Sequence, residues 1–266
     1  MARITEKASS HQTASKAEQA ALRRSGEDLI YFPAEKMGVI TVSHFPALGK
    51  LTALRFLEWV SNPGGVVSLP TGKTPEYFIK HVIGTLKNWK SPKIKQQLEE
   101  NGVDPAVKPD LHSLHFVQID EFYPMDPAQH NSFHYYVDKF YLGEFGLDRA
   151  KAMLIDCSQI GLPRGTDLDT VWPDGEVDLS LRHRHAISNQ EELQKHVLEE
   201  VDQWCYEYEE QIKSLGGIGF FLGGIGPDGH IAFNVMGPQQ HDTSHFNQLR
   251  DPGRLCCGSG GHRSGP

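Results

Sequence analysis

The sequence predicts an α/β fold with a Rossmann-like parallel sheet and flanking helices. Apolar, β-branched runs alternate along the chain with amphipathic helical patterns, and the longest helical pattern leads directly into a further apolar run. Polar and glycine residues follow three of these runs. Such alternation is typical of βαβ units, whose strands pair in parallel. With 266 residues, the chain is long enough for one large domain or two small ones.

Apolar runs and helical periodicity locate the elements in chain order. Strands are predicted over residues 37–42, from 65 into a tight loop, over 114–119, over 151–157 and from 218 into a run of glycines. Helices are predicted from Pro46 to a stop at 62–65, from Pro75, over 132–142 and over 189–215. Proline suits the first turn of a helix, where its missing N–H is no loss. Ser188 and Glu191 form a capping-box pattern at the start of the last helix.

Charge and hydropathy exclude several classes of protein. The formal net charge is −8, from 26 Lys+Arg and 34 Asp+Glu, and the pI is about 5.9. Nucleic-acid-binding domains are usually basic, so no nucleic-acid partner is expected. No apolar run is as long as a bilayer span and the N-terminus has no signal-peptide core, so we expect a cytoplasmic protein without membrane contact. The four cysteines form no CxxC pair and are expected to be reduced.

Composition divides the chain into three parts. Residues 1–28 are rich in Ser, Lys, Gln and Ala and are predicted to be a mobile polar arm. Residues 29–245 carry the alternating strands and helices and are predicted to form the α/β domain. Residues 246–266 show no apolar period and are predicted to be an irregular tail.

The loop after the strand that starts at residue 65 has features that suit a phosphate. It contains Thr71, Gly72 and Thr74, and ligands of parallel α/β sheets bind at such strand ends. Gly72 can adopt backbone angles that other residues resist, and the following helix presents unpaired N–H groups and its positive dipole end. The spacing differs from the P-loop consensus, and an ordinary strand-to-helix turn is an equal alternative.

Two adjacent carboxylates, Asp120 and Glu121, follow the strand predicted over 114–119. Neighbouring side chains of an extended segment alternate in direction, so only one of the two is expected to face a cleft. A carboxylate placed there could abstract a carbon-bound proton. The alternative is a solvated strand end or a helix cap.

The glycine-rich run from Gly223 to Asn234 follows the last predicted strand. Asp228 and His230 lie two residues apart within it, so the carboxylate can orient or charge the imidazole. A histidine held in this way transfers protons near neutral pH. The alternative is a glycine-rich turn with a buried polar pair.

Two other groups are assigned to structure rather than to chemistry. The run Arg182-His183-Arg184-His185 could bind a metal or an anion but is predicted to be a solvated loop. The aromatic residues within 133–141 are predicted to be core. No Cys/His spacing matches a zinc site.

The three loops together resemble those of the glucosamine-6-phosphate deaminase family, also called isomerases, and more distantly those of 6-phosphogluconolactonases. The matching segments, in the family's order, are SLPTGKTP (68–75), IDEFYPMDPAQHNSFHYYVDKFY (119–141) and FLGGIGPDGHIAFN (221–234). The last segment is highly specific, and Phe233-Asn234 after the histidine favours the deaminase branch.

The resemblance implies a sugar-phosphate reaction without a cofactor or an obligatory metal. Its steps are ring opening, proton transfer between C1 and C2, and loss of ammonia to give fructose 6-phosphate. By motif matching, Asp120 is the enolisation base, and His230, paired with Asp228, drives ring opening. The expected substrate contacts are Thr71, Gly72, Thr74, Glu121, Gly226 and Gly229. Hexamers occur in the family, so the resemblance leaves a homo-oligomer open without fixing the oligomeric state.

Two departures from the family pattern keep alternatives open. Val235 stands where the family has a glutamate that completes an Asp/His/Glu set and raises the pKa of the histidine. The family continues with further strands, helices and a phosphate-clamping Arg and Lys, so we expect the C-terminal part of this fold to be incomplete, through a shifted reading frame or alternative splicing. An incomplete chain is expected to have little activity alone. The alternatives are a 6-phosphogluconolactonase-like hydrolase and an inactive sugar-phosphate-binding fragment.

Overall fold

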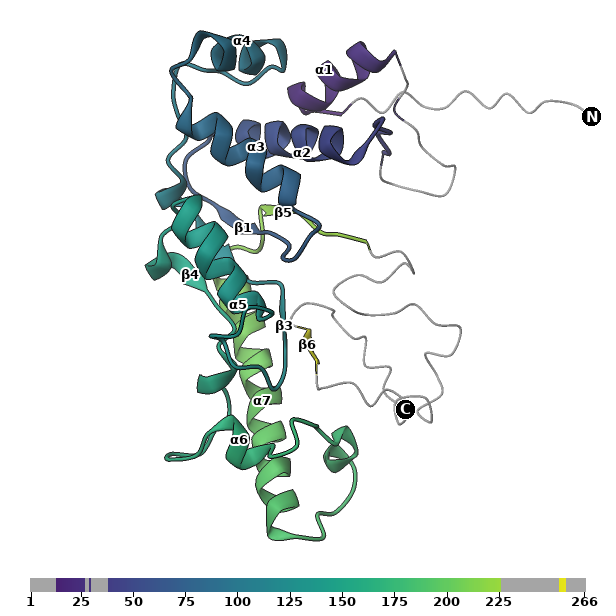
Figure 1. Cartoon of the computed structure of the whole chain (residues 1–266), viewed down its shortest axis with the longest axis vertical. Helices are drawn as coiled ribbons and strands as arrows, with labels where there is room; N and C mark the ends of the chain where they lie inside the picture. The colour runs from purple at the N-terminus through teal and green to yellow at the C-terminus, as the bar shows by residue number, and fades with distance from the viewer. Residues whose placement is uncertain (1–12, 27–28, 30–37, 226–253, 257–266) are drawn as a thin grey trace, which may run out of the picture. The chain divides into compact units, whose positions relative to one another are not determined.

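The computed structural model describes residues 13–26, 29, 38–225 and 254–256, the last segment by its backbone alone (Figure 1). The chain forms two compact units, residues 1–64 with 75–111 and residues 65–74 with 112–266. It therefore leaves the first unit after residue 64, contributes one strand and its loop to the second, and then returns. The predicted domain boundaries after residues 28 and 245 lie outside the described residues.

Helices build the described part of the first unit. They are α1 (Lys16–Ser25), α2 (Phe45–Trp59), α3 (Glu76–Lys87) and α4 (Pro92–Glu100). Helices α2 and α3 pack together through buried side chains, with the rings of Phe56 and Phe78 edge to face at 5.5 Å. The helices predicted from Pro46 and Pro75 are confirmed, since Pro46 lies in the first turn of α2 and Pro75 directly precedes α3.

Helix α1 lies within the segment that is predicted to be a mobile arm. Ser15 caps it by accepting a hydrogen bond from the Glu18 N–H at 3.2 Å. The N–H of Lys16 donates to the carboxylate of Glu58 on α2 at 2.6 Å, and Ala17 is fully buried. The prediction is therefore corrected for this part of the arm: a serine cap and small buried alanines dock a helix whose composition is otherwise polar.

The strand predicted over 37–42 does not form in the described residues 38–42. They contain a single isolated bridge residue, Val39, whose side chain is exposed. A β-branched composition favours a strand only where a neighbouring strand and a buried face are available. The prediction of a strand over 37–42 is therefore wrong for the described residues 38–42.

A parallel sheet forms the centre of the second unit. Its strand order is β4 (Ala152–Met153), β2 (His115–Val117), β1 (Val66–Ser68) and β5 (Phe220–Phe221). The register places Val67 opposite Phe116 on one side and opposite Phe220 on the other. The predicted Rossmann-like parallel sheet is thereby confirmed, with shorter strands than the apolar runs indicate.

Strand β3 (Asp120–Phe122) follows β2 after two residues. It pairs antiparallel with β6 (Arg254–Cys256) in a separate two-stranded sheet. The tail over 246–266 is predicted to be irregular, and β6 corrects that prediction for three residues. The physical reason is that an exposed strand edge offers backbone hydrogen-bonding groups to any extended segment, whatever its side-chain pattern.

Helical elements cover both faces of the sheet within the second unit. Val117 lies in a core shared with α7 (Asn189–Ser214), whereas the ring of its neighbour Phe116 lies 5.6 Å from that of Tyr141 on the π-helix η2 (Val137–Glu144). Consecutive strand residues face opposite sides of a sheet, so these contacts define its two faces. The helix predicted over 189–215 is confirmed, and the one over 132–142 is formed by α5 (Phe133–Tyr136) and η2.

The core between α7 and the sheet contains most of the buried hydrophobic side chains among the described residues of the second unit. Its members are Val66, Val117, Tyr123, Ile155, Cys157, Ile160, Val171, Trp172, Leu181, Val197, Leu198, Val201 and Tyr208. Within it the hydroxyl of Tyr208 shares its single proton between the carbonyl oxygens of Gln118, at 2.9 Å, and Met153, at 3.0 Å. This side chain therefore ties α7 to the ends of β2 and β4.

Short helices complete the described chain. They are η1 (Leu111–Ser113), η3 (Arg149–Lys151), η4 (Cys157–Gln159), α6 (Leu168–Val171) and η5 (Leu179–Arg182). Among all helices in the described ranges, none combines the length and the apolar character that a membrane span requires.

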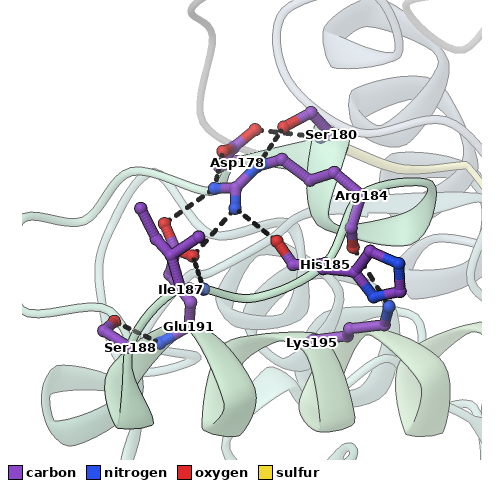
Figure 2. Close-up of polar contacts among 8 residues, drawn as sticks. All are labelled: Asp178, Ser180, Arg184, His185, Ile187, Ser188, Glu191 and Lys195. Carbon is purple, nitrogen blue, oxygen red and sulfur yellow. Dashed lines mark hydrogen bonds and ion pairs between the residues drawn. The ribbon is translucent and has the colours of Figure 1, made fainter.

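The Arg182–His185 run is largely exposed, as predicted for a solvated loop, but its Arg184 is half-buried and paired with a carboxylate of α7. Figure 2 shows the guanidinium of Arg184 between the carboxylates of Asp178 and Glu191, with nitrogen–oxygen distances of 2.8 Å and 2.7 Å. The carboxylate of Glu191 also accepts from the Ile187 N–H at 2.7 Å, and these contacts lower its pKa to about 2. The prediction of a solvated loop is therefore confirmed for Arg182, His183 and His185 and is refined for Arg184, which is half-buried between two carboxylates. No group of three or more metal-ligating side chains occurs among the described residues.

The capping box at the start of α7 forms only in part. The Ser188 hydroxyl accepts from the Glu191 N–H at 3.2 Å, as the pattern predicts. The Glu191 side chain bonds Ile187 and Arg184 instead of the Ser188 N–H. The carboxylate thus joins the helix start to the preceding loop (Figure 2).

We expect Tyr208→Phe to lower the free energy of unfolding by about 1–2 kcal/mol, because it removes a buried hydroxyl that bonds two carbonyl groups. Denaturant titration measures the change. Tyr206→Phe, on the same helix but 60% exposed, is the matched control and should change stability by less than about 0.5 kcal/mol. Equal effects of the two variants would contradict the assigned role of the Tyr208 hydroxyl.

Candidate active site

The sheet order brings the segments after β1 and β5 to one place. From β1 the chain builds outward through β2 to β4, and then returns to add β5 on the other side of β1. In open α/β sheets ligands bind at the carboxyl ends of the strands where the order reverses in this way. Residues 69–74, here called the anion loop, and residues 222–225 leave the sheet at this point.

The two segments touch at Thr74 and Gly224. A Cβ atom on Gly224 would lie 2.9 Å from Cγ2 and 3.4 Å from Oγ1 of Thr74. The absence of a side chain at Gly224 therefore permits the approach. Gly72 has a φ of +76°, a conformation that favours glycine, and open space surrounds its missing Cβ. The structure thus brings the predicted loop residue Thr74 against the start of the second glycine-rich run.

Glu121 is the helix-capping member of the carboxylate pair. Its carboxylate accepts hydrogen bonds from the Ser132 hydroxyl at 2.8 Å and from the His134 N–H at 2.7 Å. The N–H groups of Phe122 and Phe133 also donate to it, at 2.9 Å and 3.1 Å. The side chain is nearly fully buried. Four donors satisfy this carboxylate, so in this structure it holds the start of α5.

Asp120 is the member of the pair whose carboxylate is left available. It is 7% exposed, and among the described residues no hydrogen bond reaches its side-chain oxygens. Burial, together with the charge of Glu121, raises the pKa of Asp120 to about 6. A carboxylate with that pKa is ionised at neutral pH and accepts a proton more readily than an ordinary aspartate.

Gln118 fixes the backbone beside Asp120 and was not singled out by the sequence. Its side-chain N–H donates to the carbonyl oxygen of Asp120 at 2.9 Å, and its side-chain oxygen accepts from the Ile155 N–H at 3.0 Å. The side chain is 1% exposed. The only signal was an amide at the end of an apolar run, and such a residue has no chemistry of its own that a motif would reveal.

The remaining predicted site residues divide into two groups. Thr71 lies in the anion loop between Pro70 and Gly72 and is half-buried. Gly226, Asp228, Gly229, His230 and also Val235 lie outside the described residues.

The raised pKa of Asp120 predicts a pH-dependent cost in stability. Between about pH 4 and pH 6 the folded protein keeps a proton that the unfolded chain releases, so the free energy of unfolding decreases as pH rises through this window. We expect Asp120→Asn to raise the free energy of unfolding near neutral pH by about 1–3 kcal/mol and to lose this gain by about pH 4. Denaturant titrations across pH measure it.

The matched control for this prediction is Asp174→Asn, because Asp174 is an exposed aspartate in a turn of the same unit. Its effect should be small and independent of pH. A destabilised Asp120→Asn variant near neutral pH would contradict the account of a desolvated carboxylate.

Comparison with known proteins gives one recurring name. No family model matches the chain. The glucosamine-6-phosphate deaminase of Bacillus velezensis is 24% identical over 219 residues, which cover 82% of this chain and 67% of that protein. The deaminase of Borreliella burgdorferi is 73% identical over 45 residues, and that of Bacteroides fragilis 66% identical over 38 residues. These two local matches span 17% and 14% of the length of their relatives.

Among solved structures, a monomeric glucosamine-6-phosphate deaminase, described as a missing link of the NagB superfamily, aligns with a TM-score of 0.47 and 18% identity. The alignment covers 73% of this chain and 58% of that one. The sequence matches show that the chain is similar to glucosamine-6-phosphate deaminases, over most of its length at 24% identity and over short segments at 66–73% identity.

Proposed function

We propose that this chain is a sugar-phosphate isomerase and deaminase that converts glucosamine 6-phosphate to fructose 6-phosphate and ammonia. The observation that carries the proposal is the Asp120 carboxylate, which is buried and reached by no hydrogen bond from the described residues. Asp120 follows β2 by three residues, and β2 pairs with β1, from which the anion loop leaves the sheet. The names of the curated relatives support the choice of substrate.

In the proposed reaction Asp120 removes the proton from C2 of the open-chain aminosugar. The electron pair of the broken C–H bond forms a C1=C2 double bond, and the carbonyl pair moves onto the C1 oxygen, which takes up a proton and gives an enolamine. The same carboxyl group returns the proton to C1, which leaves an imine at C2. The amino group releases a proton when the imine forms, so the protons balance. Water adds to the imine and ammonia leaves, so that the oxygen of fructose 6-phosphate at C2 comes from water. A pKa of about 6 suits a group that must both accept and return a proton.

The anion loop is the proposed phosphate site. Backbone N–H groups and the hydroxyls of Thr71 and Thr74 are donors of the type that binds phosphate, and Gly72 permits the left-handed turn between them. In this proposal His230, oriented by Asp228, assists ring opening; both residues follow Gly224 within six residues along the chain. A lactonase of related fold requires no base at C2, so the behaviour of Asp120 distinguishes the two reactions.

We expect Asp120→Asn to lower deaminase activity by about 10²–10⁴-fold, the usual loss for a general base. Ammonia release and exchange of the C2 proton with deuterated water measure it, and the exchange detects even slow turnover. For the unsubstituted chain, kcat/KM should fall as pH decreases through about 6, because a protonated carboxyl group accepts no proton.

Asp174→Asn is again the control and should leave both readouts unchanged. The proposed function is wrong if Asp120→Asn turns over at the rate of the unsubstituted chain. It is also wrong if the unsubstituted chain neither binds glucosamine 6-phosphate nor exchanges its C2 proton.

Gly72→Val should weaken the binding of glucosamine 6-phosphate by at least about tenfold, since a β-branched residue resists the left-handed backbone that the anion loop requires. Isothermal titration calorimetry measures the affinity. Gly165→Val is the matched control, because Gly165 also has a positive φ, of +86°, and open space around its missing Cβ. If both variants bind alike, the loop is not the phosphate site.

A further inference from the structure

The hydroxyl of Tyr141 bonds directly to the anion loop. It donates to the carbonyl oxygen of Pro70 at 2.5 Å, and the tyrosine side chain is fully buried. The same peptide group contains the N–H of Thr71. A trans peptide is planar, with its C=O and N–H pointing in opposite directions. Holding the Pro70 oxygen therefore also sets the direction of the Thr71 N–H, which is a backbone donor of the loop.

Tyr141 is also connected to Asp120 and Glu121, through the helical segment formed by α5 and η2. The first N–H groups of α5 donate to the carboxylate of Glu121, and α5 continues without a break into η2, which carries Tyr141. Glu121 directly follows Asp120 along β3. One continuous helical segment thus connects the carboxylate pair to the anion loop.

Aromatic packing fixes the position of the Tyr141 ring. The rings of Phe116 and Phe145 lie 5.6 Å and 5.2 Å from it, and that of Tyr136 lies 6.1 Å away. Burial raises the pKa of Tyr141 well above its ordinary value, so the hydroxyl keeps its proton and remains a donor. A ring without the hydroxyl would fill the same space, and a buried hydroxyl is costly unless it has a partner. The hydroxyl therefore serves the bond to Pro70.

We propose that Tyr141 is a positioning residue that orients the Thr71 N–H toward the phosphate of the substrate and holds the anion loop at a set spacing from Asp120. The identity of the substrate in this proposal rests on the proposed function, whereas the effect on phosphate binding is independent of the reaction. A set spacing favours ligands whose phosphate and reacting carbon lie at the two ends of one sugar chain.

The test is Tyr141→Phe in the full chain. We expect the affinity for inorganic phosphate and for glucosamine 6-phosphate, measured by calorimetry, to fall by about 3–10-fold, the loss expected for one hydrogen bond. The KM should rise in parallel, while kcat and the decline of kcat/KM near pH 6 stay unchanged. Binding of glucosamine, which lacks the phosphate, should also be unchanged. A merely structural role would not separate these readouts.

Tyr135→Phe is the matched control, since Tyr135 lies on the same helical segment and no hydrogen bond of its hydroxyl occurs among the described residues. Thermal unfolding of both variants shows whether they are folded at the assay temperature. The double variant Tyr141→Phe/Gly72→Val provides a second measurement. If both residues act through the loop, the two losses of phosphate affinity should combine to less than their sum.

The proposal is overturned if Tyr141→Phe binds phosphate as tightly as the unsubstituted chain, if the two losses are additive, or if the unsubstituted chain binds no phosphate. The proposed function is tested separately by Asp120→Asn. Loss of the reaction with a retained phosphate effect would leave Tyr141 as the positioning residue of a phosphate site with other chemistry.

Discussion

The hydrogen bonds that Glu121 accepts are the interaction on which the candidate site depends. Four donors, three of them backbone N–H groups, saturate this buried carboxylate. The saturation fixes the start of α5 and, through η2, the position of Tyr141. It also makes adjacent carboxyl groups unequal, because four donors bond Glu121 while Asp120 is buried without a donor among the described residues. Two carboxylates of similar intrinsic acidity thereby acquire different roles.

A buried carboxylate without a hydrogen-bond donor, such as Asp120 among the described residues, lowers the free energy of unfolding. Other interactions of the second unit offset this cost. The apolar core between α7 and the sheet supplies the main favourable term, and Gln118 and Tyr208 immobilise the backbone around Asp120. Local conflicts with the rules of burial are expected at functional sites. That no described residue bonds the Asp120 carboxylate is therefore consistent with chemistry at this position.

The contact between Thr74 and Gly224 shows how the sheet order assembles the site from distant segments. The two residues are 150 positions apart in the sequence, yet β1 and β5 are neighbours in the sheet. Glycine at 224 has a packing reason that is independent of any ligand. The anion loop is consequently held from two directions, by Gly224 at its end and by the Tyr141 hydroxyl near its start.

The sequence by itself determined the elements whose signal is local. Proline and capping residues located α2, α3 and α7, and alternation of apolar runs with helices predicted the parallel sheet. It also identified the residue types of the site, because carboxylates after an apolar run and a glycine loop after another are visible without coordinates. The prediction of a strand over 37–42 is wrong for residues 38–42. A strand requires a neighbouring strand to pair with, and the composition of one segment does not show whether such a neighbour is present.

Only the tertiary structure decided which carboxylate is available, since Asp120 and Glu121 look alike in sequence and differ in the donors that meet them. It likewise decided that Tyr141, which has the sequence pattern of a core aromatic residue, bonds the anion loop, and that Arg184 joins two carboxylates. The physical reason is common to all three. Burial and hydrogen-bond partners are properties of side chains brought together from separate segments, and no local pattern records which segments meet.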